Sequence, residues 1–108
     1  MMTSTKVKIV VFVPESHAEK VRQAMGDAGA GVIGNYTHCS FSSKGQGRFL
    51  PQVGAHPAIG EVGKFELVEE NRIEMTCDRE KLQEVVAAMK QAHLYEEVAF
   101  DVYPLEEI

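Results

Sequence analysis

The stretch that decides the fold is Gly29-Ala30-Gly31-Val32-Ile33-Gly34-Asn35-Tyr36-Thr37-His38-Cys39-Ser40-Phe41. It joins a segment with helical periodicity to a segment with the two-residue periodicity of a strand. Glycine at position 29 adopts a positive φ without a steric penalty, so it is a natural end for the preceding helix. From residue 35 to residue 43 successive side chains alternate between two faces, which predicts a strand. The chain is therefore expected to pass from helix to strand through a glycine-rich turn.

The segment before this turn predicts one strand and one helix. Residues 7–13, Val-Lys-Ile-Val-Val-Phe-Val, are almost continuously apolar and β-branched. A strand that is apolar on both faces belongs in the middle of a sheet. Pro14 ends that strand. Residues 15–28 then carry apolar side chains at three- and four-residue spacing, which is the pattern of a helix with one buried face.

The segment after the turn predicts a second change of direction. Residues 42–47, Ser-Ser-Lys-Gly-Gln-Gly, have the composition of a turn. Residues 48–50 predict a short returning strand that ends at Pro51. Residues 52–63 contain a proline and three glycines and predict a loop. Loops of this length inside a compact domain are often functional.

The last third of the chain predicts a strand, a helix and a final strand. Residues 65–77 alternate as a long strand, except that residues 69–71 interrupt the apolar set, and a bulge there would restore the register. Asp78 is placed to cap the next helix, which is expected to end near His93. Residues 98–103 alternate again as the last strand.

This order of elements predicts an α+β fold of the ferredoxin-like, split βαβ class. We expect an antiparallel sheet with both helices on one face, because right-handed crossovers place them together. Of the four main strands, the first (residues 7–13) and the third (residues 65–77) are expected to be central in the sheet. With no linker or low-complexity segment in the chain, residues 1–108 are expected to form a single domain.

Composition excludes several classes of function. The net charge is −5 and the basic residues are scattered, whereas nucleic-acid binding needs a basic face that neutralises phosphates. No apolar run approaches the roughly 20 residues that cross a membrane, and no signal peptide is evident. Cys39 and Cys77 lie too far apart for a CxxC motif, which suits a reducing compartment. We therefore expect a cytoplasmic protein with no nucleic-acid or membrane partner.

The glycines at 29, 31 and 34 match the GxGxxG string of dinucleotide sites. That chemistry requires the string to follow a strand and open a helix, so that the phosphates meet the helix N-terminus. Here the string follows a predicted helix, and a plain glycine-rich turn is the better interpretation. His38 and Cys39 are adjacent in a predicted strand and would face opposite ways, so they form neither a metal pair nor a nucleophile with its base.

Several short motifs occur in order along the chain. They are Gly29-Ala-Gly-x-Ile-Gly-Asn-Tyr36, Cys39-Ser-Phe41, Gly45-x-Gly47-x-Phe49-x-Pro51, Gly60-x-x-Gly63, Glu69-Glu-x-Arg-Ile-Glu74 and His93-x-Tyr95-Glu-Glu97. With these motifs the chain resembles the PII-like insert domain of the Nif-three-like (YqfO) family, and the match covers almost the whole chain, from Lys6 to Leu105. It looks like a free-standing version of that insert.

The resemblance implies a PII- and CutA-like fold and a homo-oligomer, either a trimer or a dimer. It also raises a divalent metal as the candidate cofactor, whose identity stays open. The family's core domain carries its dinuclear metal site and its GTP cyclohydrolase-homologue label. Because none of that core is present in this sequence, neither its dinuclear metal site nor hydrolysis is carried over, and the divalent metal is raised only by the similarity of fold to CutA.

The first hypothesis for function is a non-catalytic, oligomeric module that binds a small ligand, a metal ion or a protein partner in a regulatory role. Its predicted site joins the glycine-rich turn to the end of the second helix. The expected ligand-binding residues are Gly31, Gly34, Asn35, Tyr36, His38, His93 and Glu96. If a metal is held, the expected ligands are His38, His93 and Glu96, since zinc accepts both imidazole nitrogen and carboxylate oxygen.

Two hypotheses of other classes stay open. One is a structural interaction module whose exposed strand pairs with a partner protein. The other is a small metal-dependent hydrolase that uses His38, His56, His93 or Glu96. Stoichiometric metal together with turnover that chelation removes would identify the hydrolase, whereas association without a small molecule would identify the interaction module.

Overall fold

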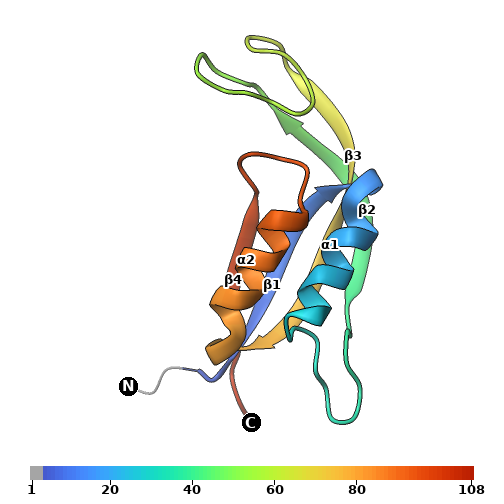
Figure 1. The fold of residues 1–108 in the computed structure, drawn as a ribbon, viewed down its shortest axis with the longest axis vertical. Coiled ribbons are helices and arrows are strands. Elements are labelled where there is room, and N and C mark those ends of the chain that lie inside the picture. Colours follow the sequence, from blue (N-terminus) through green and yellow to red (C-terminus); the bar gives the residue numbers. More distant parts are fainter. Residues whose placement is uncertain (1–3) are drawn as a thin grey trace.

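The computed structural model describes residues 4–108 of the chain. The elements in order are β1 (Lys6–Pro14), α1 (Glu15–Asp27), β2 (Phe41–Phe49), β3 (Glu66–Asp78), a 3-10 turn (Arg79–Lys81), α2 (Leu82–Ala92) and β4 (Phe100–Pro104). The strands form one antiparallel sheet in the order β2-β3-β1-β4. Both helices lie over the same face of this sheet (Figure 1). The predicted α+β class is confirmed, and so are the central positions of β1 and β3.

The core lies between the sheet and the two helices. β1 is buried on both faces, since Val10 is fully buried on the face opposite the helices, as its nearly continuous apolar sequence predicts. On the helix side β1 and β3 pack against α1 and α2. The core residues with no exposed surface there are Val7, Ile9, Val11, Val13, Val21, Met25, Ala30, Ile73, Val85 and Met89. This packing fixes the two helices on the sheet and leaves the opposite face without a helix.

The predicted strand over residues 35–43 is confirmed only for residues 41–43, and the predicted turn over residues 42–47, with a returning strand over residues 48–50, is wrong. Ile33 and Tyr36 instead bond to each other across a tight two-residue turn, and β2 begins only at Phe41. It then pairs with β3 without interruption, from Phe41 opposite Glu74 to Phe49 opposite Glu66. Strand pairing is made by backbone N–H and C=O groups. The long edge of β3 therefore holds the serine and glycine residues of positions 42–47 in a strand, although their side chains favour a turn.

The predicted bulge at residues 69–71 is also wrong, because β3 keeps one continuous register with β2. The physical reason is that β1 pairs with β3 only over residues 70–78. Residues 66–69 pair with β2 alone, so Leu67 and Glu69 have no core to face. Residues 46–69 therefore form a two-stranded arm with a loop at its tip, and the arm extends beyond the helices (Figure 1).

The helix start after β3 differs from the predicted one. Asp78 makes no side-chain capping bond, and a 3-10 turn precedes α2. The carboxylate of Asp78 pairs instead with the ammonium group of Lys6 on β1. α1 ends at Asp27, and Gly29 adopts a φ of 118° just beyond it, as predicted. Among residues 4–108, neither helix is long and apolar enough to cross a membrane.

Gly31 holds the α1–β2 loop against the sheet. Its N–H donates to the Thr76 carbonyl at 2.7 Å, and its own carbonyl accepts from the Cys39 N–H at 2.9 Å. Its φ is 81°, and a Cβ there would lie 2.6 Å from both the backbone nitrogen and the backbone oxygen of Cys39. No side chain fits this position without moving the loop.

We therefore expect Gly31→Ala to lower the free energy of unfolding by about 2 kcal/mol or more, from the left-handed backbone and the clash together. Gly45→Ala is the matched control, since no atom lies within 4 Å of its added Cβ. It should change stability by less than about 0.5 kcal/mol. Urea unfolding measures both, and equal losses in the two variants would contradict this role of Gly31.

Candidate functional site

The structure does not bring the two halves of the predicted site together. The glycine-rich loop follows the C-terminus of α1, whereas His93 and Glu96 follow the C-terminus of α2, at the opposite end of the helical layer (Figure 1). α1 has 13 residues, and at 1.5 Å per residue it is about 20 Å long. Within one chain the two groups therefore lie at least about a helix length apart.

In the glycine-rich loop most of the predicted ligand-binding residues have structural roles. Gly34 and Asn35 form the tight turn, and Gly34 has a φ of 57°. Tyr36 is 74% exposed. The imidazole Nε2 of His38 lies 2.9 Å from the Asp27 carboxylate, and its hydrogen bond lowers the pKa of Asp27. A ligand-binding role for this loop stays a prediction.

His93 is buried and holds two segments together. Its Nε2 lies 2.8 Å from the Phe12 carbonyl, and its Nδ1 accepts from the Tyr95 N–H at 3.0 Å. These partners assign the neutral tautomer with the proton on Nε2, because Nδ1 must accept. Burial lowers the pKa of His93. The hydrogen bond to the Phe12 carbonyl raises the pKa, but by less than burial lowers it. Both ring nitrogens are occupied, so His93 is a structural residue.

The predicted metal ligands His38, His93 and Glu96 do not meet in one chain. Glu96 accepts a hydrogen bond from the His56 N–H at 2.7 Å. Over residues 4–108 no group of three or more His, Cys, Asp and Glu side chains is arranged to hold a metal ion.

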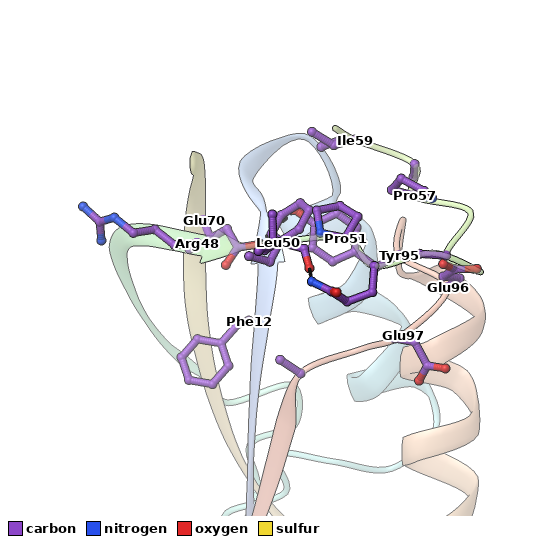
Figure 2. Close-up of a pocket in the computed structure, with 16 residues that line it drawn as sticks. Phe12, Arg48, Leu50, Pro51, Pro57, Ile59, Glu70, Tyr95, Glu96 and Glu97 are labelled. Atoms are coloured by element: carbon purple, nitrogen blue, oxygen red, sulfur yellow. Dashed lines mark hydrogen bonds between the residues drawn. The ribbon is translucent and has the colours of Figure 1, made fainter. Parts of the chain in front are cut away.

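A cavity of about 390 Å³ lies at the base of the arm. Four segments that are distant in sequence form its walls: the end of β1, the end of β2 with the loop that follows, the start of β3, and the α2–β4 turn (Figure 2). Its volume falls within the range of about 300–1,000 Å³ that is usual for small-molecule sites. The residues that line it include Phe12, Gly47, Phe49, Glu70, Tyr95 and Glu96.

Glu70 and Tyr95 connect the arm to the α2–β4 turn. The Tyr95 hydroxyl donates to the Glu70 carboxylate at 3.1 Å, and the Tyr95 ring packs edge-on against Phe49 at 5.7 Å between centroids. Gly47 makes room for the carboxylate, because a Cβ there would lie 2.0 Å from Glu70 Oε1. Burial, and next the charge of Glu70, raises the pKa of Tyr95 far above its usual value, so the hydroxyl stays a donor.

Sequence reasoning missed Glu70, Tyr95 and Gly47 as site residues. The sequence pattern places Glu70 in a predicted interruption of a strand and Gly47 in a predicted turn. All three residues belong to the motifs that carry the family resemblance. Those motifs are the available signal for the site, but they do not show that the three residues meet.

No family model matches the chain. A Halalkalibacterium halodurans protein described as "GTP cyclohydrolase 1 type 2 homolog" is 52% identical over 103 residues, which is 95% of this chain and 28% of that protein. A Bacillus subtilis protein of the same description is 52% identical over 100 residues, or 93% of this chain and 27% of that protein. The crystal structure of a Bacillus cereus protein related to NIF3 matches with a TM-score of 0.84 and 52% identity, over 99% of this chain and 27% of that one.

The chain is homologous to the PII-like insert region of these NIF3-related proteins. It spans about a quarter of the length of the curated relatives it matches. Two structures of low identity show the same PII- and CutA-like fold. The divalent cation tolerance protein CutA of Archaeoglobus fulgidus has a TM-score of 0.68 at 19% identity, over 94% of this chain and 85% of that one. GlnK of Bacillus subtilis has a TM-score of 0.59 at 18% identity, over 93% of this chain and 84% of that one.

In this PII-like region the buried His93 makes stability depend on pH. Its pKa is lowered in the folded state, so the unfolded chain takes up the proton first as the pH falls. The stabilisation is complete above the unfolded pKa of about 6.5 and is lost as the pH falls through the folded value. His93→Gln should cost about 1–3 kcal/mol at about pH 7.5 and flatten the decline toward about pH 5.5.

Urea unfolding across this pH range measures the effect, and His56→Gln at an exposed histidine is the matched control. The control should keep the pH dependence of the natural chain. If the free energy of unfolding of His93→Gln fell with pH as steeply as that of the natural chain, the result would contradict the proposed role of His93 in holding the α2–β4 turn to β1.

Proposed function

We propose that this chain is a non-catalytic, self-associating PII-like module that binds a small molecule in the cavity at the base of the arm, in a regulatory role. The observation that carries the proposal is the convergence of four separate segments on one cavity of about 390 Å³. Residues from β1, β2, β3 and the α2–β4 turn all line it. A molecule bound there touches the arm, the end of β1 and the α2–β4 turn together, so its occupancy would change how firmly the arm is held.

The composition of the cavity wall supports binding over covalent catalysis. Among its described lining residues there is no serine, threonine, cysteine, histidine or lysine. Most covalent catalysis uses one of those side chains with an adjacent base; carboxylate and tyrosine nucleophiles also occur, but Glu70 and Tyr95 are hydrogen-bonded to each other here. The walls are instead apolar and aromatic, with a few polar groups that face the cavity, which is typical of a recognition site.

Filling the cavity tests the binding proposal. Ala55 lines it from the loop of the arm, so Ala55→Leu narrows the space without removing a polar contact. In a thermal-shift screen against a panel of soluble metabolites, at least one compound should raise the melting temperature of the natural chain. The same compound should act weakly on Ala55→Leu, because bound ligand stabilises only the state that binds it.

The exposed Ala87 of α2 offers the control, since Ala87→Leu adds the same side chain outside the cavity. It should respond as the natural chain does. A compound that stabilises Ala55→Leu and Ala87→Leu equally binds elsewhere and would overturn the cavity as the site.

Self-association is supported by apolar side chains left exposed at both ends of the molecule. Phe65 is 82% exposed and Leu67 is 49% exposed on the arm. Ile33 and Phe41, at the other end, are 58% and 68% exposed. Exposed apolar groups that gather in this way typically mark contact surfaces. The radius of gyration is 14.9 Å, against about 13 Å for a compact chain of this length, because the arm projects from the body.

We expect the chain to form a discrete trimer or dimer in solution, which light scattering after size exclusion measures. Phe65→Ser with Leu67→Ser should shift it toward monomer while the fold stays intact, since both side chains are exposed. Replacing the exposed Lys20 with Ser is the control and should leave the assembly unchanged. A natural chain that is monomeric at tens of micromolar would rule out this part of the proposal.

A further inference from the structure

The Glu70 carboxylate is the most unusual group in the cavity wall. The residue is only 9% exposed, and within residues 4–108 its carboxylate accepts one hydrogen bond, from the neutral Tyr95 hydroxyl. Among residues 4–108 no Lys, Arg or His nitrogen lies within 4.0 Å of it. A carboxylate accepts about four hydrogen bonds, and a buried charge is usually paired. Glu70 therefore has unused capacity for a donor that carries positive charge.

The aromatic walls around Glu70 favour the same kind of guest. The rings of Phe49 and Tyr95 meet edge-on. Phe12 also lines the cavity (Figure 2), but the guanidinium of Arg72 already lies 5.9 Å from its ring centroid, so the preference rests on Phe49 and Tyr95. The face of an aromatic ring attracts a cation within about 6 Å of its centroid, and the attraction grows when water is excluded. Leu50, Pro51 and Ile59 complete an apolar wall suited to a hydrocarbon body.

The charges around the cavity add to this preference. Glu70, Glu96 and Glu97 line it, against a single basic residue, Arg48. The Arg48 guanidinium points away from the cavity (Figure 2) and donates to Gln46 at 3.4 Å. The Glu96 carboxylate is held at the rim by the His56 N–H. A cavity whose lining charges are mostly acidic concentrates guests of positive charge.

We infer that the cavity is a site for a small organic cation, an ammonium group on an apolar body. The ammonium group donates to Glu70, and the body lies against Phe49, Tyr95 and Pro51. This assignment rests on the small-molecule binding proposed above and names its chemical class. Tyr95 is the sensing contact, because the hydroxyl that reaches Glu70 belongs to the turn that His93 holds to β1.

Three six-carbon probes that differ only in their head group test the inference. Hexylamine is a cation at neutral pH, hexanol is neutral and hexanoate is an anion. Titration of the isotope-labelled full chain with each, followed by amide NMR shifts, should move the resonances of Tyr95 and Gly47 with hexylamine most strongly and with hexanoate least. Glu70→Gln keeps the shape and an acceptor for Tyr95, and should weaken hexylamine binding at least fivefold.

Glu69→Gln is the matched control. It removes the same charge one residue away, where the side chain bonds Gln46 and does not line the cavity. It should leave hexylamine binding nearly unchanged. Hexanol or hexanoate binding as strongly as hexylamine, or equal losses in Glu70→Gln and Glu69→Gln, would overturn the cation assignment and leave the cavity as a ligand site. If no probe shifts the resonances of the residues that line the cavity, the cation assignment and the cavity as a ligand site are both overturned.

Discussion

The arrangement at the candidate site depends on one buried imidazole. His93 donates to the Phe12 carbonyl and accepts from the Tyr95 N–H, so it fixes the α2–β4 turn to the end of β1. That turn then places the Tyr95 hydroxyl on Glu70 of β3. The bond from the Tyr95 N–H requires an unprotonated Nδ1, so protonation of His93 would break it and release the turn and with it one wall of the cavity, although Nε2 would still donate to the Phe12 carbonyl. A histidine at a helix end is here a clamp between distant segments.

The length of β3 is the second constraint. The strand has 13 residues, whereas β1 has nine, so β3 extends past the sheet and carries β2 with it. The arm, the loop at its tip and the cavity at its base all follow from this excess length. At the base of the arm the side chains face no helical layer, and the cavity forms where the α2–β4 turn reaches across to them. Fold and site are therefore linked through β3.

Periodicity in the sequence predicted the parts of the fold that bury a face. The continuous apolar run in β1 and the helical stripes of α1 and α2 were enough to predict the central strand, both helices and the class of fold. β2 was misplaced because its position depends on pairing with β3 rather than on its own side chains. The site could not be predicted in the same way, because the contact between Glu70 and Tyr95 joins residues 25 positions apart. His38 and His93 were predicted to share one site, whereas within one chain they lie at opposite ends of the helical layer (Figure 1). Both carry an imidazole that can bind a ligand, and the lengths of the loops do not reveal how far apart the two residues lie.

Native mass spectrometry of the freshly purified chain tests the central claim, a self-associating module with a ligand in its cavity, most directly. It reports the number of subunits and any bound mass in one spectrum. Our account predicts a discrete trimer or dimer that carries a small organic mass, released on denaturation and reduced in Ala55→Leu. A monomer of bare polypeptide mass in every charge state would contradict it.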